Sequence, residues 1–272
     1  NINNLYELSR SENEKSFKQN LVNNNYDLVI DLQNNFRSRR LTSSIGGVKH
    51  LFKKPTLKKT LLVKLKINLF KNWKSIPQLY AESLPELKLD DNGLDLYLPE
   101  NVKSELTINK KTIGFCPGAK HYTKRWPVLY FTELGNKLVN EGYQVVIFGG
   151  KDDADICGEI AKEVSGAINL SNNNNLYQTT VNMKHCDAII CNDSGLMHVA
   201  SAIGKPLIAL FGSSVKEFGF TPYKNKNIIL ENKYLNCRPC SHIGRKNCPK
   251  HHFSCMMELT PSIVFNNLKN LL

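Results

Sequence analysis

The chain has 272 residues and a formal net charge of +12, from 36 Lys and Arg against 24 Asp and Glu. That length predicts two domains rather than one. The apolar runs are too short to span a bilayer, and the absence of a zinc-finger, RNP or basic recognition-helix pattern argues against nucleic acid as the partner of the basic surface.

The first strand expected along the chain is Asp27–Leu32. Asp31 stands at its carboxyl end, where an aspartate usually forms a turn or a cap. A catalytic role for Asp31 is the alternative.

A strongly basic segment follows this strand. No Asp or Glu occurs from Leu32 to Ala81, while twelve Lys and Arg fall between Arg37 and Lys74. Within it an apolar residue recurs at every fourth position, which predicts an amphipathic helix. We expect this helix either to lie on an anionic membrane or to pack its leucine stripe against the domain core. The stripe comprises Leu57, Leu61, Leu65, Leu69 and Trp73, among Lys58, Lys59, Lys64, Lys66, Lys71 and Lys74.

The chain divides near Asp90–Gly93 or along the linker Pro99–Lys111, and from residue 112 strand and helix patterns alternate. Such alternation predicts an α/β domain with a parallel sheet and helices on both faces. The expected strands are Thr112–Cys116, Tyr143–Phe148, Ala167–Leu170, Ala188–Cys191 and Pro206–Phe211, and the expected helices are Pro127–Asn140, Ala154–Val164, Leu176–His185 and Ser194–Ile203.

The most informative junction is Asn192–Gly195, where a buried strand meets a polar turn and a small-residue helix. Ligands of parallel sheets bind at this end of the strands, and a helix N-terminus there offers free N–H groups to a phosphate or sugar oxygen. His198 follows one turn later. In the competing interpretation, Asp193 only caps the helix.

Two further loops are predicted to reach the same end of the sheet. One strand ends in Gly149 and Gly150, and another leads through Lys120 to Lys124 and Arg125. Glycines let the backbone approach a bound group closely, and the cations attract anions. No GxGxxG or P-loop pattern occurs in the expected place, which argues against a standard dinucleotide fold or a P-loop NTPase.

Eight cysteines divide into two groups. Cys116, Cys157, Cys186 and Cys191 are scattered, and the last two are expected to be buried. The other four cluster late in the chain and predict a structural role, and their thiolates are candidate ligands of a tetrahedral zinc. The cluster is Cys237, Cys240, Cys248 and Cys255.

Taken together, these segments resemble glycosyltransferase family 9, the ADP-heptose:lipopolysaccharide heptosyltransferases. The resemblance implies a GT-B fold, in which two Rossmann-like domains with parallel sheets face a cleft. It places an acceptor-side domain at residues 1–100, a nucleotide-sugar-binding domain at 111–260 and a carboxyl-terminal helix at 261–272. The motifs are YDLVIDLQNNFRSRRLTSSIG, PGAKHYTKRWP, VVIFGGKDD, NDSGLMHVASAIGKPLIALFGSS and the CRPC…CP…CM series.

The resemblance also implies roles for single residues. Lys124 contacts the donor phosphates and Asp193 binds the sugar hydroxyls, with Lys120 or Arg125 in support. Either Asp152 or Asp153 holds the adenosine ribose, while the stretch Ser171–Leu176 departs from the apolar pattern expected next to adenine. The remaining donor-binding positions are Gly149, Gly150, Ser194, Gly195, Leu196 and His198.

The implied reaction is an inverting transfer of heptose, or a similar sugar, from an ADP-sugar to the inner core of lipopolysaccharide. We expect no metal in this reaction, an anionic lipopolysaccharide precursor as acceptor, and a cytoplasmic protein that is peripheral at the inner membrane. The arginines Arg37, Arg39 and Arg40 are the candidate acceptor contacts. A non-catalytic nucleotide-sugar-binding or scaffold protein is the alternative, and an epimerase would need further acid and base residues.

One departure concerns the beginning of the sequence. The family has a first strand and a Gly-Asp-rich turn that carries its proposed general base, and nothing before Tyr26 matches that turn. We therefore expect the opening part of the acceptor domain to be missing from this sequence.

Overall fold

The computed structural model describes residues 2–9, 13–107, 109–173 and 175–272. Asn1, Ile108 and Asn174 fall outside these ranges, so the sequence interpretations that include them are not tested there. The chain forms two compact units. Unit 1 comprises Asn1–Thr56 and Ile76–Asp90, and unit 2 comprises Leu57–Ser75 and Asp91–Leu272. Within the described ranges, no helix is both long and apolar enough to cross a membrane.

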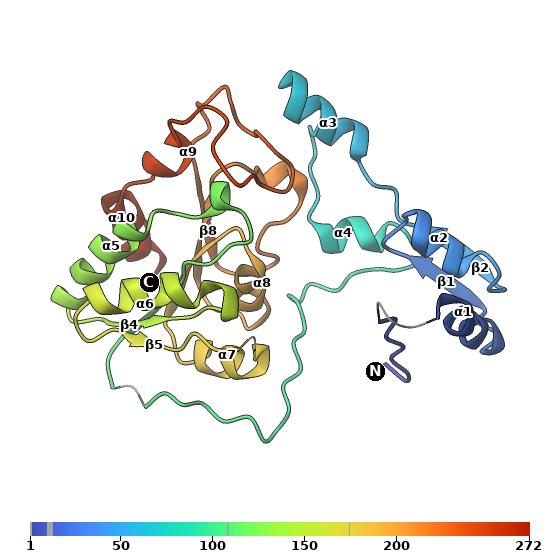
Figure 1. Ribbon diagram of the computed structural model, residues 1–272, viewed down its shortest axis with the longest axis horizontal. Helices are drawn as coiled ribbons and strands as arrows, with labels where there is room; N and C mark the ends of the chain where they lie inside the picture. The colour runs from blue at the N-terminus through green and yellow to red at the C-terminus, as the bar shows by residue number, and fades with distance from the viewer. Residues whose placement is uncertain (1, 10–12, 108, 174) are drawn as a thin grey trace. The chain divides into compact units, whose positions relative to one another are not determined.

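Unit 1 contains a short parallel sheet with helices beside it (Figure 1). Strands β1 (Leu28–Asp31) and β2 (Val48–Leu51) pair in parallel, with Leu28 opposite Val48. The strand expected at Asp27–Leu32 is thus present and one residue shorter at each end. The helices of this unit are α1 (Glu14–Asn23), α2 (Phe36–Thr42) and α4 (Ile76–Ala81).

Asp31 serves the turn that follows β1. Its Oδ1 accepts hydrogen bonds from the backbone N–H groups of Gln33 (3.0 Å) and Asn34 (2.7 Å), and its Oδ2 accepts one from the Ser38 hydroxyl (2.7 Å). Both carboxylate oxygens are therefore used to fold the connection into α2. This is the turn role that the sequence favoured over catalysis.

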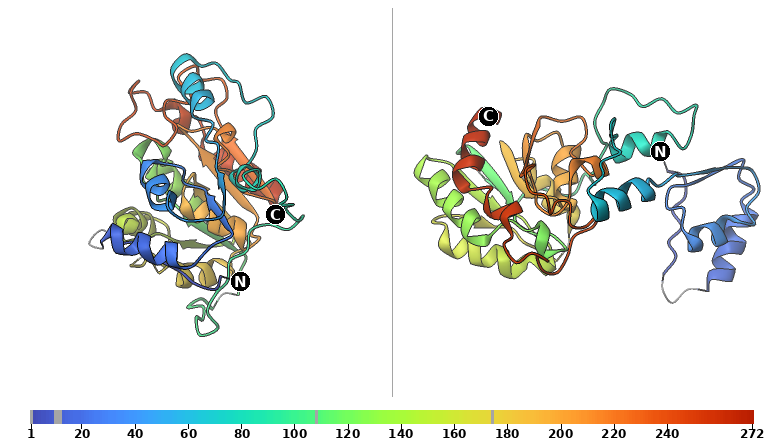
Figure 2. Two further views of the ribbon diagram at one scale, coloured as in Figure 1. Left: turned by 90° about the vertical axis from the view of Figure 1, so that its right-hand side faces the viewer. Right: turned by 90° about the horizontal axis from the view of Figure 1, so that it is seen from above.

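Unit 2 is built on a six-stranded parallel sheet with the strand order β5-β4-β3-β6-β7-β8 (Figures 1 and 2). The expected strands are all present, each within two residues of its predicted bounds. A sixth, β8, is an addition that the sequence interpretation missed. The strands are β3 (Thr112–Cys116), β4 (Gln144–Ile147), β5 (Ile168–Asn169), β6 (Ala188–Asn192), β7 (Leu207–Phe211) and β8 (Asn227–Glu231).

Helices cover both faces of this sheet. Successive strand residues point to opposite faces, so Val145 and Ile147 join one core while Val146 and Phe148 join the other. The first core is closed by α5 (Val128–Asn140), α6 (Ala154–Glu163) and α10 (Pro261–Leu271), and the second by α7 (Leu176–Met183) and α8 (Gly195–Ala202). A short helix, α9 (Ser254–Met257), precedes α10. The predicted α/β class with parallel sheets is confirmed.

The basic helix differs from its prediction. Helix α3 (Thr56–Leu65) ends where Lys66 adopts a left-handed backbone with φ of 61°, so the four-residue stripe does not continue to Trp73. The Lys66 ammonium donates hydrogen bonds to the carbonyls of Val63 (2.9 Å), Cys237 (3.1 Å) and Pro239 (2.6 Å). The predicted continuous helix over residues 57–73 is therefore wrong, because a lysine bound to three carbonyls turns the chain away.

Candidate functional site

The order of the central sheet reverses between β3 and β6, because β4 and β5 lie on one side of β3 and β7 and β8 lie on the far side of β6. Loops that leave such a switch point diverge and open a crevice at the carboxyl ends of the strands. A cavity of about 730 Å³ lies there. Its lining includes nine residues that the sequence assigned to the donor site: Lys120, Arg125, Gly149, Gly150, Asp152, Asp153, Ser194, Gly195 and Leu196.

Asn192 joins the two loops that border this crevice. Its side-chain Oδ1 accepts a hydrogen bond from the Trp126 backbone N–H (3.0 Å), and its Nδ2 donates one to the Pro117 carbonyl (2.7 Å). The side chain is fully buried, so breaking either bond leaves a polar group without water. Asn192 thereby fixes the loop after β3 against the end of β6, a role the sequence interpretation did not assign.

The N-terminus of α8 faces the cavity without a side-chain cap. Ser194 is the N-cap residue and its hydroxyl makes no capping bond, and the first turn contains no acidic residue. Ser194 and Gly195 both line the cavity. The first backbone N–H groups of α8 thus form a partly positive end, which suits a bound anion.

Asp193 does not cap α8. Its Oδ2 lies 2.7 Å from the Lys124 ammonium, and the two side chains are only 6% and 16% exposed. The Ser214 hydroxyl donates a short hydrogen bond to the same oxygen. Lys124 and Asp193, the two residues that the resemblance ranks first, therefore form an ion pair beside Ser194, although neither lines the cavity itself.

His198 lies one turn into α8, near this ion pair. Burial lowers the pKa of the His198 imidazole, Asp193 acts to raise it, and Lys124 lowers it further. The net lowering favours the neutral ring. A neutral imidazole offers one donor and one acceptor to its neighbours.

The glycine-rich loop after β4 separates its two candidate ribose carboxylates. Asp153 folds inward, where its Oδ2 accepts a hydrogen bond from the Gly150 N–H at 3.3 Å. A Cβ at Gly118 would lie 2.2 Å from the Asp153 carboxyl carbon, so only glycine fits there. Asp152 is exposed and lines the cavity. Both carboxylates line the cavity, and Asp153 also shapes the loop, so the choice between them for the ribose stays a prediction.

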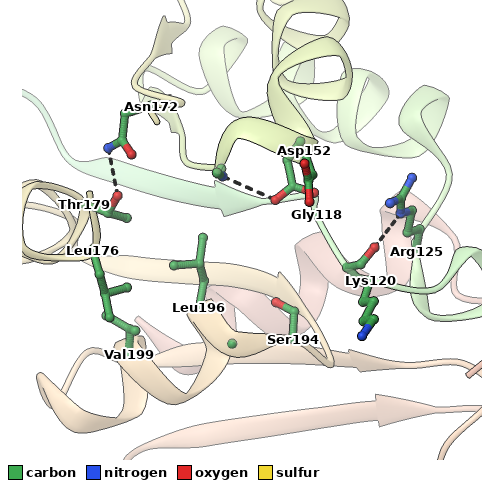
Figure 3. A pocket seen from close by; sticks show the side chains of 15 residues that line it. Gly118, Lys120, Arg125, Asp152, Asn172, Leu176, Thr179, Ser194, Leu196 and Val199 are labelled. Atoms are coloured by element: carbon green, nitrogen blue, oxygen red, sulfur yellow. Dashed lines mark hydrogen bonds between the residues drawn. The ribbon is translucent and has the colours of Figure 1, made fainter. Parts of the chain in front are cut away.

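The cavity has two chemically different ends (Figure 3). Leu176, Leu196 and Val199 gather at one end, and Lys120 and Arg125 lie at the other. The Arg125 Nε donates to the Ala119 carbonyl at 2.7 Å, which holds the guanidinium against the loop after β3. An apolar end and a cationic end suit a ligand with one flat apolar part and one anionic part.

The apolar end also contains a polar pair. The Asn172 Nδ2 donates a hydrogen bond to the Thr179 hydroxyl (3.0 Å), and its Oδ1 accepts one from the Asn175 N–H (2.9 Å). Asn172 is therefore bonded both to Asn175 and to helix α7. Leu176, the last residue of the stretch 171–176, supplies apolar surface to the cavity.

The three arginines named as acceptor contacts lie on α2 in unit 1. Arg37 Nε lies 3.1 Å from Glu14, and Arg40 pairs with the same carboxylate. Arg39 Nε donates to the Asn34 side chain at 2.6 Å. All three have partners inside unit 1, and their role toward an acceptor stays a prediction.

The clustered cysteines surround a very small cavity of about 10 Å³, together with Arg238 and His252. The Cys237 sulfur lies 3.8 Å from His252 Nε2. Over the part of the chain that the structure describes, no group of three or more His, Cys, Asp or Glu side chains is placed to hold a metal ion. The zinc stays a prediction.

The scattered cysteines are buried, as expected for small apolar side chains. Burial raises the pKa of Cys157 and of Cys186 to about 12, and it raises the pKa of Cys116 and Cys191 as well. Thiols with such pKa values stay protonated near neutral pH, so they act as packing groups rather than nucleophiles.

Comparisons with known proteins show what this chain is similar to. Residues 15–251 match the family model of glycosyltransferase family 9 (heptosyltransferase). The lipopolysaccharide heptosyltransferase 2 of Salmonella typhimurium is 36% identical over 197 residues, which is 69% of this chain and 53% of that protein. The lipooligosaccharide heptosyltransferase 2 of Campylobacter jejuni is 35% identical over 188 residues, 65% of this chain and 57% of that protein. The chain thus spans about half the length of the curated relatives it matches.

A solved structure extends the likeness to both units. The ADP-heptose LPS heptosyltransferase II of Escherichia coli superposes with a TM-score of 0.69 at 27% identity, over 95% of this chain and 80% of that one. The predicted GT-B class is confirmed. With a family model that covers most of its residues, this chain belongs to glycosyltransferase family 9.

Proposed function

We propose that this chain binds an ADP-sugar in the cavity of unit 2 and transfers the sugar, a heptose or a similar one, to an anionic lipopolysaccharide precursor with inversion at the anomeric carbon. The observation that carries this proposal is the meeting of the uncapped α8 N-terminus, Lys120, Arg125 and the Lys124–Asp193 pair at one switch point. Three sources of positive charge, the α8 N-terminus, Lys120 and Arg125, border the cavity there, and the Lys124 ammonium lies next to them in its pair with Asp193.

The cavity supports a division of the donor into three parts. Leu176, Leu196 and Val199 receive the base, and exposed Asp152 accepts hydrogen bonds from the ribose. The diphosphate lies between the α8 N-terminus and the cations. A volume of about 730 Å³ is within the range of small-ligand sites.

Each of these groups then has its own role in the transfer. As the acceptor hydroxyl attacks the anomeric carbon and gives up its proton to a general base, the bond from that carbon to the phosphate oxygen breaks and negative charge grows on the departing ADP. Lys124 and the α8 N-terminus stabilise this charge, because they are already oriented in a largely buried site. The Asp193 carboxylate accepts hydrogen bonds from the hydroxyls of the sugar.

The surface around α3 supports a peripheral position on a membrane. Leu57 and Leu65 are 71% and 62% exposed, and Lys58 and Lys64 are exposed on the same helix. Exposed leucines beside lysines suit an anionic bilayer, where the lipid acceptor would lie. We therefore place the protein at the cytoplasmic face of the inner membrane. No feature of the fold favours the non-catalytic alternative.

The test is a calorimetric titration of the chain with ADP, UDP, GDP and ADP-heptose at one salt concentration. We expect ADP to bind more tightly than UDP or GDP, and ADP-heptose to bind more tightly than ADP. Lys124→Ala removes a charged hydrogen bond to the diphosphate and should weaken ADP about ten- to hundredfold.

Lys162→Ala is the charge-matched control, because Lys162 is exposed on α6 outside the cavity. It should leave all four affinities within about twofold. Thermal unfolding of both variants separates a binding effect from loss of fold. Equal affinity of wild type and Lys124→Ala for ADP, or a preference for another base, would overturn the assignment.

A further inference from the structure

The two oxygens of the Asp193 carboxylate have different surroundings. Oδ2 receives both the Lys124 ammonium at 2.7 Å and the short hydrogen bond from the Ser214 hydroxyl. Oδ1 has no hydrogen-bond partner among the residues that the structure describes, and it is not completely sealed from solvent. One oxygen therefore anchors the side chain, and the other keeps its hydrogen-bonding capacity for a ligand.

Ser214 is held rigidly in the turn after β7. Its carbonyl accepts a hydrogen bond from Arg238 Nη2 (2.7 Å), and Arg238 Nε donates to the Gly212 carbonyl (2.5 Å). Arg238 is fixed in turn by Glu231 at 3.0 Å, with both side chains only 5% exposed. A buried, fully bonded guanidinium leaves this turn little freedom to move.

The same turn is tied to the loop that carries Lys124. The Thr123 hydroxyl donates to the Ser213 hydroxyl (3.0 Å), and the Ser213 N–H donates to the Thr123 carbonyl (3.1 Å). The residues just before Lys124 and Ser214 are thus joined by two hydrogen bonds. The backbone segments that carry Lys124 and Ser214 are therefore held next to each other.

We propose that Ser214 is a positioning residue for the donor sugar. Its hydroxyl fixes the Asp193 carboxylate through Oδ2 and directs Oδ1 to accept a hydrogen bond from a sugar hydroxyl. A bound diphosphate competes with Asp193 for the Lys124 ammonium, so with donor present the Ser214 hydroxyl is the partner of Oδ2 that stays. This role rests on the proposed function, because it requires a sugar next to the diphosphate.

The test compares the affinities of Ser214→Ala and wild type for ADP and for ADP-heptose by calorimetry. Ser214→Ala should keep the ADP affinity within about twofold and lower the preference for ADP-heptose over ADP about tenfold, because only the sugar contact depends on the Asp193 orientation. Ser214→Thr retains the hydroxyl and should restore the preference. In an Asp193→Ala background, Ser214→Ala should cause no further loss.

Ser201→Ala is the matched control. The Ser201 hydroxyl is buried and bonded to Tyr223 N (2.9 Å) and Tyr223 O (3.1 Å) at the far end of α8. It should destabilise the fold and leave the preference for ADP-heptose unchanged. Ser214→Cys gives a second test at nearly unchanged volume, since a thiol is a weak donor.

The outcomes separate two failures. If wild type prefers ADP-heptose and both Ser214→Ala and Ser214→Cys keep that preference, the positioning role is wrong while the donor site stands. Equal weakening of ADP and ADP-heptose in Ser214→Ala would also overturn it, because a merely structural serine acts on both ligands. If wild type itself does not distinguish ADP-heptose from ADP, the proposed function fails, and the role of Ser214 falls with it.

Discussion

At the scale of single residues, the site depends on the ion pair between Lys124 and Asp193. Two opposite charges that are 16% and 6% exposed stabilise each other only when the geometry is good, and Ser214 supplies the additional hydrogen bond such a pair needs. Removing one member leaves the other charge buried and unpaired. Substitutions here therefore affect both binding and folding, and each variant requires a stability measurement.

His198 makes the free energy of unfolding depend on pH. Burial lowers the pKa of the folded imidazole below its ordinary value of 6.5. As the pH falls through that value, the unfolded chain takes up a proton that the folded chain resists. The free energy of unfolding therefore decreases on acidification, and the loss is complete below the folded pKa.

We predict that wild type loses more stability than His198→Gln between about pH 7.5 and about pH 5.5. Urea denaturation at both pH values measures this, and the difference between the two proteins cancels the contributions of the other histidines. Equal losses of stability in wild type and variant would show that His198 does not cause this pH dependence.

At the scale of elements, helix α3 departs from the leucine stripe that its sequence predicted. The leucines at four-residue spacing predicted one continuous stripe, but Leu57 and Leu65 are exposed and Leu62 is the buried residue of the helix. Lys59 lies over the rings of Phe218 (5.8 Å) and Phe220 (5.2 Å). Lys59 thus holds the helix against the rest of unit 2, and the outer leucines of the helix stay exposed.

Replacing Lys58 and Lys64 with glutamine should reduce the flotation of the protein with anionic liposomes. Each lysine near an anionic surface contributes about 1 kcal/mol, so the double variant should bind at least about tenfold more weakly. Lys110→Gln with Lys162→Gln removes the same charge from exposed positions elsewhere and is the control. Unchanged flotation of the α3 variant, or equal losses in both, would argue against a membrane role for α3.

At the scale of the whole molecule, the two units differ in how completely they bury their cores. The best-buried apolar residues of unit 1 include Ile45 and Phe52, which are 5% and 7% exposed. In unit 2, β3, β4, β6 and β7 contribute side chains that are almost or completely buried. A smaller, less sealed core gives a lower free energy of local unfolding.

Hydrogen exchange followed by mass spectrometry should therefore show faster exchange in β1 and β2 than in β3 and β6. We expect the difference in rate to reach orders of magnitude, because amides in the central strands open only with the whole of unit 2. The edge strand β5 serves as an internal comparison, since it is short and paired on one side only. Equal protection of β1 and β3 would mean that both units unfold together.

The sequence by itself determined five of the six strands of unit 2 and nine of the residues that border its cavity. The apolar run Val145–Phe148 and the polar turn after Cys191 are local signals, because each can be recognised from neighbouring residues in the chain. The same signal, an apolar run, is present in Asn227–Glu231, where β8 was missed.

Only the tertiary structure decided how these pieces meet. The strand order brings distant loops to one crevice, and the Asn192–Pro117 bond joins residues that are 75 positions apart. Ser214 and Arg238 carry no local mark of their roles, and the stop of α3 at Lys66 depends on carbonyls 171 and 173 residues away. Contacts of this range are set by topology and packing, which the pattern of neighbouring residues does not specify.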